Sequence, residues 1–112
     1  KEAHKAADEL EKDDISCEII DLRTIRPMDY EPILKSVKKT NRLVILEESW
    51  PFGNISTEIT YKVQNEAFDY LDAPIIKINT ADTPAPYSPV LLKEWLPNSN
   101  DVVKAVKKVL YI

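Results

Sequence analysis

Two side chains of this sequence could supply a nucleophile and its base. Cys17 and His4 are the only cysteine and the only histidine in the chain. A cysteine becomes a nucleophile when a base or a positive site stabilises its thiolate. Cys17, however, lies in an alternating apolar pattern, and His4 lies between the alanines of a helical pattern, which together favour a buried structural thiol and a surface imidazole. One cysteine and one histidine also cannot form a four-ligand zinc site without several carboxylates.

A pair of carboxylates is the second candidate for chemistry. Glu47 and Glu48 directly follow the aliphatic run Leu43–Leu46. Open α/β sheets bind ligands at the carboxyl ends of their strands, and paired acids there could carry out acid–base catalysis. Alternatively, the two acids face the positive end of the next helix. We expect this structural role.

Two further segments have a functional and a structural interpretation. The basic residues Lys35, Lys38, Lys39 and Arg42 could attract phosphate, or could form the solvated carboxyl-terminal face of a helix. The proline-rich segment 82–89 could bind an aromatic groove as a polyproline helix, or could stiffen a long connection. We expect the structural alternative in both cases. With one glycine in the chain, there is almost no room for a glycine-rich phosphate loop.

The elements that position these residues follow from hydrophobic periodicity. Helices are expected within 1–14, from an Asp29 cap with Pro32 in the first turn, from Asn54 to Tyr70, and from Asn100 or Asp101. Strands are expected at 15–22, 43–46 and 75–78, with a long loop at 80–97.

This alternation of helices and strands predicts an α/β fold. The expected architecture is a three-layer α/β/α sandwich with a mostly parallel sheet, forming one domain over residues 1–112. Leu43–Leu46 should be its central strand, because a continuous aliphatic run is typical of a strand covered on both faces. Since a βα fold normally opens with a strand and this sequence opens with a helical pattern, we expect a first strand to be missing.

Composition excludes several classes of protein. The net charge of −4 argues against general nucleic-acid binding. The longest aliphatic run has four residues, far short of the ~20 apolar residues of a membrane span. A single cysteine cannot form an internal disulfide and favours a reducing compartment.

The stretch Asp21-Leu-Arg-Thr-Ile-Arg-Pro-Met-Asp29 resembles the beta subunits of the thiamine-dependent 2-oxo acid dehydrogenases. The resemblance continues through Lys38–Val44, Glu47-Glu48, Trp50-Pro51, Glu66–Pro74, Pro84–Tyr87 and Val106–Val109. It covers nearly the whole chain and corresponds to the family's transketolase-like C-terminal domain. Arg26 and Met28, on either side of Pro27, resemble the pyruvate dehydrogenase branch more than the branched-chain branch.

The resemblance implies a heterotetramer of two alpha and two beta subunits that decarboxylates pyruvate and reductively acetylates a lipoyl group. Thiamine diphosphate and magnesium would lie between the alpha subunit and the N-terminal domain of the beta subunit. We therefore expect no catalytic residue, cofactor or metal ligand in this chain, which would serve structure, assembly and docking. The implied location is the mitochondrial matrix, with the bacterial cytoplasm as the alternative.

Two kinds of contact with partners are expected, the first of them implied by the resemblance. Asp72 and the carboxylate of Ile112 match the family's acceptors for the subunit-binding domain of the dihydrolipoyl acyltransferase. Arg23 and Arg26 lie beside a proline at a strand end, where they are poorly placed for core packing, so at least one of them is expected to pair with a carboxylate across a domain or subunit interface. The rival hypothesis is a stand-alone, non-catalytic α/β binding module, such as a receiver-like domain.

One loop departs from the family pattern. Ser49, Asn54 and Ser56 stand where glycine is usual. Asn tolerates a positive φ better than most residues, so Asn54 is expected to keep the turn, whereas Ser56 should adopt an ordinary conformation.

Overall fold

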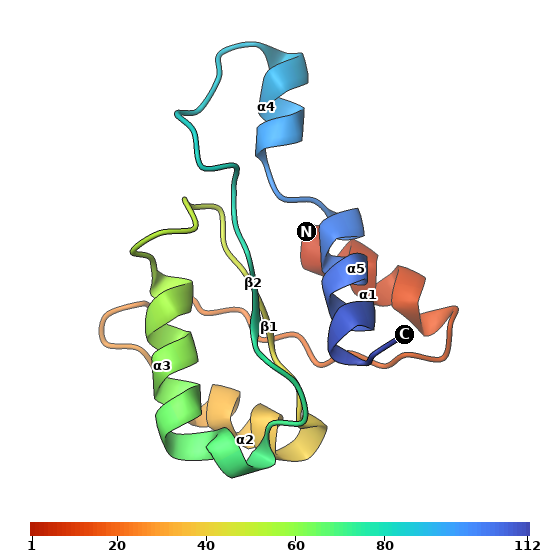
Figure 1. The fold of residues 1–112 in the computed structure, drawn as a ribbon, viewed down its shortest axis with the longest axis vertical. Coiled ribbons are helices and arrows are strands. Elements are labelled where there is room, and N and C mark those ends of the chain that lie inside the picture. Colours follow the sequence, from red (N-terminus) through yellow and green to blue (C-terminus); the bar gives the residue numbers. More distant parts are fainter.

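Two parallel strands with helices on both faces form the centre of the computed structural model, which describes residues 1–112 (Figure 1). Strand β1 (Val44–Leu46) pairs with β2 (Ile76–Ile78) in the register Val44 to Ile76 and Leu46 to Ile78. The helices are α1 (Glu2–Glu11), α2 (Glu31–Thr40), α3 (Ile55–Ala67), the 3₁₀ turn η1 (Phe68–Tyr70), α4 (Pro89–Trp95) and α5 (Ser99–Val109). None of these helices has the length and apolarity needed to cross a membrane.

The core divides into two clusters, one on each face of the sheet. On one face Leu43, Ile45 and Ile75 pack against the buried residues of α2 and α3: Ile33, Val37, Ile59, Val63 and Ala67. On the other face Val44, Leu46 and Ile76 pack with Ile78 against Ala6 of α1 and Val102 and Ala105 of α5. Successive strand residues point to opposite faces, so the continuous run 43–46 supplies both clusters. The predicted three-layer α/β/α arrangement is confirmed.

Most helix ends agree with their sequence signals. Asn54 caps α3, with its side chain accepting a hydrogen bond from the Thr57 N–H. Helix α5 begins earlier than expected, because Asn98 and Asp101 form a reciprocal capping box. Pro32 lies in the first turn of α2, and the Asp29 carboxylate accepts from the Glu31 N–H at 3.2 Å, although Tyr30 occupies the cap position.

The strand expected at 15–22 is absent. This segment is extended, but no backbone N–H or C=O from Ser16 to Met28 is hydrogen-bonded to another backbone group. In Figure 1 the segment, in orange, crosses the line of β1 and β2 instead of running beside them. The alternating pattern therefore predicts an extended conformation correctly, but a strand also needs a neighbour for its ladder.

Two smaller expectations also need correction. The run Leu43–Leu46 is covered on both faces as predicted, but β1 pairs on one edge only and is not central, so its residues are half-buried. The segment 80–97 is not entirely loop, because α4 occupies Pro89–Trp95. Proline at the first helical position is compatible with a helix start, since its missing N–H would be unpaired there in any case.

Candidate functional site

The cysteine and the histidine do not form a catalytic pair. His4 is exposed on α1, as predicted. Cys17 is also exposed, so its predicted burial is wrong, because the segment that carries it has no sheet neighbour to cover it. Partial desolvation nevertheless raises the pKa of the Cys17 thiol above its usual value. A raised pKa leaves less of the nucleophilic thiolate at neutral pH.

Glu47 caps a helix, as its structural interpretation predicts. Its two carboxylate oxygens accept hydrogen bonds from the N–H groups of Ile55 (3.3 Å) and Ser56 (2.9 Å), at the start of α3. A carboxylate at this end of a helix satisfies free donors and complements the helix dipole. Glu48 is exposed.

In the glycine-poor loop before α3, the residue with a positive φ is not the one that we expected. Gly53 takes the positive φ, at 61°, whereas Asn54 is extended with φ −127° and ψ 177°. Asn54 is thereby free to cap α3. The hydroxyl of Ser56, a fully buried residue in the first helical turn, donates to the Asn54 side-chain oxygen at 2.6 Å.

The three lysines of the basic cluster form a solvated helix face, as predicted. Lys35, Lys38 and Lys39 are all exposed on α2. The Lys38 ammonium lies 5.4 Å from the centre of the Tyr70 ring, and Lys39 pairs with Glu18 at 3.5 Å. The hydrogen bond from the Ser36 hydroxyl is the main cause that lowers the pKa of Glu18.

The proline-rich segment is fastened to its own domain. The carbonyl oxygen of Thr83 accepts hydrogen bonds from two indole N–H groups, those of Trp50 and Trp95, each at 2.8 Å. One indole follows β1 and the other ends α4. These contacts support the interpretation of the segment as a stiff connection.

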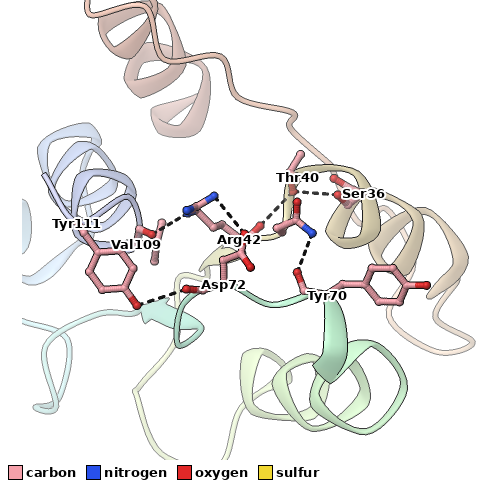
Figure 2. Close-up of polar contacts among 8 residues, drawn as sticks. Ser36, Thr40, Arg42, Tyr70, Asp72, Val109 and Tyr111 are labelled. Atoms are coloured by element: carbon pink, nitrogen blue, oxygen red, sulfur yellow. Dashed lines mark hydrogen bonds and ion pairs between the residues drawn. The ribbon is translucent and has the colours of Figure 1, made fainter.

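Asp72 lies in a turn between η1 and β2, held by the end of α2. Its N–H donates to the carbonyl oxygen of Asn41 at 2.9 Å. Asn41 ends α2 in the left-handed conformation, with φ 64°, and its side-chain amide donates to the Tyr70 carbonyl oxygen at 2.8 Å. The Asp72 turn therefore has a fixed position against α2 (Figure 2).

Arg42 and Tyr111 connect this turn to the end of α5. The Arg42 Nε donates to the carbonyl oxygen of Val109 at 2.8 Å, and its Nη1 lies 3.9 Å from a carboxylate oxygen of Asp72. The Tyr111 hydroxyl donates to the Asp72 carbonyl oxygen at 3.4 Å. Figure 2 shows Arg42 between Val109 and Asp72, with the Tyr111 hydroxyl reaching the Asp72 turn from the end of α5. Arg42 therefore does not belong to the lysine face, and the sequence interpretation missed both of these connecting residues.

The end of α5 that leads to Ile112 is thus linked to the Asp72 turn at one corner of the molecule, and both predicted partner-binding residues are open to solvent. The Asp72 side chain is 59% exposed and Ile112 is 76% exposed. The N–H of Ile112 donates to the Lys107 carbonyl oxygen, which folds the end of the chain back on the last turn of α5. This corner presents the Asp72 carboxylate beside the carboxyl end of a helix, where the dipole favours positive charge.

The other predicted interface residues, Arg23 and Arg26, are both exposed in the unpaired segment. Neither lies within ion-pair distance of a carboxylate of this chain. No group of three or more His, Cys, Asp or Glu side chains converges in a way that could hold a metal ion.

Comparison with known proteins gives one family and a consistent set of relatives. Residues 1–102 match the family described as "Transketolase, C-terminal domain". The pyruvate dehydrogenase E1 component subunit beta of Rickettsia felis is 53% identical over 111 residues, and that of Rhizobium meliloti is 56% identical over 109 residues. The mitochondrial subunit of Mus musculus is 47% identical over 109 residues.

These alignments cover 99%, 97% and 96% of this chain but 34%, 24% and 30% of the respective relatives. The chain therefore spans about a third or less of the length of the curated relatives it matches. The resemblance stated from the sequence motifs is confirmed.

Proposed function

The chain belongs to the transketolase C-terminal domain family, and from this premise we propose that it is the assembly and docking domain of a pyruvate dehydrogenase E1 beta subunit. The observation that carries the proposal is the similarity to such subunits from bacteria and from mitochondria over nearly the whole chain. Because the relatives come from both mitochondria and bacteria, the proposed location is the mitochondrial matrix, with the bacterial cytoplasm as the alternative.

The proposed activity belongs to the full enzyme. That enzyme would decarboxylate pyruvate and reductively acetylate the lipoyl group of the acyltransferase, on the way to acetyl-CoA. The donor set of this chain does not fit a magnesium site, because no three ligating side chains converge, and its Glu47 is engaged in capping α3. We accordingly assign thiamine diphosphate and magnesium to the alpha subunit and the N-terminal domain of the beta subunit, and the isolated domain is expected to be inactive.

The proposed assembly is a heterotetramer of two alpha and two beta subunits. Arg23 and Arg26 are candidates for its interfaces, because both guanidinium groups are exposed and have no carboxylate partner within the chain. Arginine is suited to planar, two-pronged pairing with a carboxylate. We propose that at least one of them makes such a pair in the assembled enzyme.

The proposed docking surface for the acyltransferase is the corner formed by Asp72 and Ile112. Two features support it. The Asp72 carboxylate is more than half exposed, and its only ion-pair partner, Arg42, lies at the long distance of 3.9 Å. Basic side chains of a subunit-binding domain could therefore approach Asp72 and the end of α5 together.

Co-expression of the full-length subunit with an alpha subunit tests the assembly and the activity. The expected result is copurification in equal amounts and decarboxylation of pyruvate that needs thiamine diphosphate and magnesium. A subunit that stays alone and leaves pyruvate unchanged would favour the stand-alone binding module. Faster turnover of branched-chain 2-oxo acids than of pyruvate would instead favour the branched-chain relative.

A further inference from the structure

Helix α4 projects from the domain and leaves its apolar side chains open to solvent. No residue of α4 is buried. Val90 is 71% exposed, Leu91 is 54% exposed, and Tyr87, which lies just before the helix, is fully exposed. In Figure 1 the helix stands at one end of the molecule, beyond the ends of β1 and β2. We call residues 82–95 the α4 arm.

The tip of the α4 arm, residues 83–92, is uncharged and mostly apolar. It contains no Asp, Glu, Lys, Arg or His, and its only side-chain hydroxyls are those of Thr83, Tyr87 and Ser88. An exposed apolar patch on a folded domain marks an interaction site. Because the tip carries no charge, the surface that fits it is also apolar and uncharged. Nucleic acid and a strongly basic domain do not have this chemistry.

The base of the α4 arm, in contrast to its tip, is fixed to the domain. The Ala81 N–H donates to the Trp95 carbonyl oxygen at 3.1 Å, which joins the two ends of the arm. The Thr83 carbonyl oxygen accepts from the indole N–H groups of Trp50 and Trp95. The arm therefore has a defined direction before any partner binds. A preorganised surface of this kind loses less conformational entropy on binding.

We infer that the tip of the α4 arm packs into an apolar hollow on the remaining part of the same subunit and holds the two parts together. This chain covers only 34% of the length of its Rickettsia relatives, and it matches a family described as a C-terminal domain, so the rest of the subunit precedes it. The Glu2 carboxylate accepts from the Ser99 N–H at 3.1 Å, so the start of α1 lies beside the residues that follow the arm.

The covalent connection favours this occupant over a separate molecule. A tethered partner is present at a high effective concentration, and it covers the tip without depending on the concentration of protein. Contacts between domains of one chain are usually of moderate size, about 600–1,500 Å². A short arm with a few exposed apolar side chains, such as Tyr87, Val90 and Leu91, suits a contact of this kind.

The α4 arm and the proposed docking corner lie at opposite ends of the sheet. The Asp72 turn precedes β2, whereas the arm follows β2. Binding of the acyltransferase at the corner therefore does not compete with the contact of the arm. The inference rests on the proposed function only in requiring a longer subunit, and it depends neither on pyruvate as the substrate nor on the acyltransferase as a partner.

Photocrosslinking on the full-length subunit tests the inference. The subunit carries p-benzoylphenylalanine in place of Tyr87 and is irradiated alone and in complex with an alpha subunit. The expected product in both samples is an intramolecular crosslink from position 87 to a peptide outside residues 1–112, identified by mass spectrometry after digestion.

Three other results would each overturn the inference. A product of twice the subunit mass would show that the tip binds a second copy. A crosslink that forms only with the alpha subunit would show that the tip binds that partner. The absence of a crosslink in both samples would show that the tip stays in solvent. Turnover of pyruvate is measured separately, so a wrong substrate assignment cannot be mistaken for an uncovered arm.

A matched pair of substitutions gives a second measurement on the same photoreactive subunit. Leu91→Asp and Lys93→Ala each make the chain more negative by one charge, but only Leu91 lies in the uncharged tip. Leu91→Asp should lower the yield of the intramolecular crosslink at least ~10-fold, because an unpaired charge is unfavourable in an apolar contact. Lys93→Ala should leave the yield unchanged. Both positions are exposed, so circular dichroism should show an intact fold in both variants. Equal yields would contradict the inference.

Discussion

The guanidinium of Arg42 donates from Nε to the main-chain carbonyl oxygen of Val109 at 2.8 Å, across 67 positions of sequence. Arg42 follows the carboxyl-terminal end of α2, and Val109 is the last residue of α5. The last carbonyls of a helix have no partner within the helix, and a cation is favoured there. Because the same guanidinium approaches Asp72, one side chain holds the end of α5 beside the Asp72 turn.

Replacing Arg42 should therefore lower the stability of the domain. Arg42→Ala is expected to reduce the free energy of unfolding by ~1.5–3 kcal/mol, the usual range for a hydrogen bond that involves a charged group. The ion pair with Asp72 should add little, because it is long and exposed to solvent. Denaturant unfolding measures the loss. Lys35→Ala, on the exposed face of α2, is the control and should change stability by less than ~0.5 kcal/mol.

Neutralising Glu47 should weaken the start of α3. In Glu47→Gln one of the two acceptor oxygens becomes an amide NH₂, which cannot accept from the N–H of Ile55 or Ser56. The expected loss in the free energy of unfolding is ~0.5–2 kcal/mol, as for other helix caps. Glu48→Gln is a matched control on the exposed neighbour. Equal stability of the two variants would show that the cap contributes nothing.

The contact of Glu18 with Ser36 should make stability depend on pH in a defined direction. Hydrogen bonding by Ser36 is the first cause that holds the pKa of Glu18 below its ordinary value of 4.5, with a smaller contribution from Lys39. A carboxylate whose pKa is lower in the folded state stabilises that state above the unfolded pKa, and the contribution is lost as the pH falls through the folded pKa. NMR titration of Glu18 should give a higher pKa in Ser36→Ala than in the wild type. An unchanged pKa would rule out the hydroxyl as its cause.

The sequence predicts the layers of helices and strands better than it predicts which strands pair. The run 43–46 alternates between the two core clusters because the strand period of two is fixed by backbone geometry. Segment 15–22 has the same local pattern, yet it is not a strand, since pairing depends on a neighbour that no local pattern contains. Arg42 was missed for a related reason: its position after a helix suggests a solvated cation, and its partner Val109 is brought close only by the fold.

Arg23 and Arg26 should contribute to assembly of the enzyme more than to the stability of the isolated domain. Both are exposed and lie outside every ion pair of this chain, so single alanine variants are expected to leave its unfolding unchanged within ~0.5 kcal/mol. At least one variant should weaken the heterotetramer, which analytical ultracentrifugation detects as dissociation at lower protein concentration. Lys93→Ala, a change at another exposed cation, serves as the control. If both arginine variants assemble like the wild type, the proposed interface role is wrong.

Docking of the acyltransferase should depend on the corner that Asp72 and Ile112 form. Calorimetry on the full heterotetramer with the subunit-binding domain can compare the wild type, Asp72→Ala and a deletion of Ile112. Asp72→Ala removes its carboxylate, whereas the deletion moves the C-terminal carboxylate from Ile112 to Tyr111. Taking one partner away from a charge pair that becomes buried in a complex costs ~2–5 kcal/mol. Each factor of ten in Kd corresponds to ~1.4 kcal/mol, so Kd should rise at least ~10-fold.

Two comparisons separate docking from local stability at this corner. Asp69→Ala removes an exposed carboxylate from η1, three residues before Asp72, and should leave Kd unchanged. Arg42→Ala removes the cation that pairs with Asp72, so the site becomes more negative. The same change removes the hydrogen bond from Arg42 to the Val109 carbonyl oxygen. If the carboxylates themselves bind the basic side chains of the partner, Arg42→Ala should leave the affinity unchanged or increase it at low ionic strength, although the domain unfolds more easily. The reason is that less positive charge then repels the incoming basic side chains. Unchanged affinity in both Asp72→Ala and the Ile112 deletion would instead mean that the acyltransferase binds another surface.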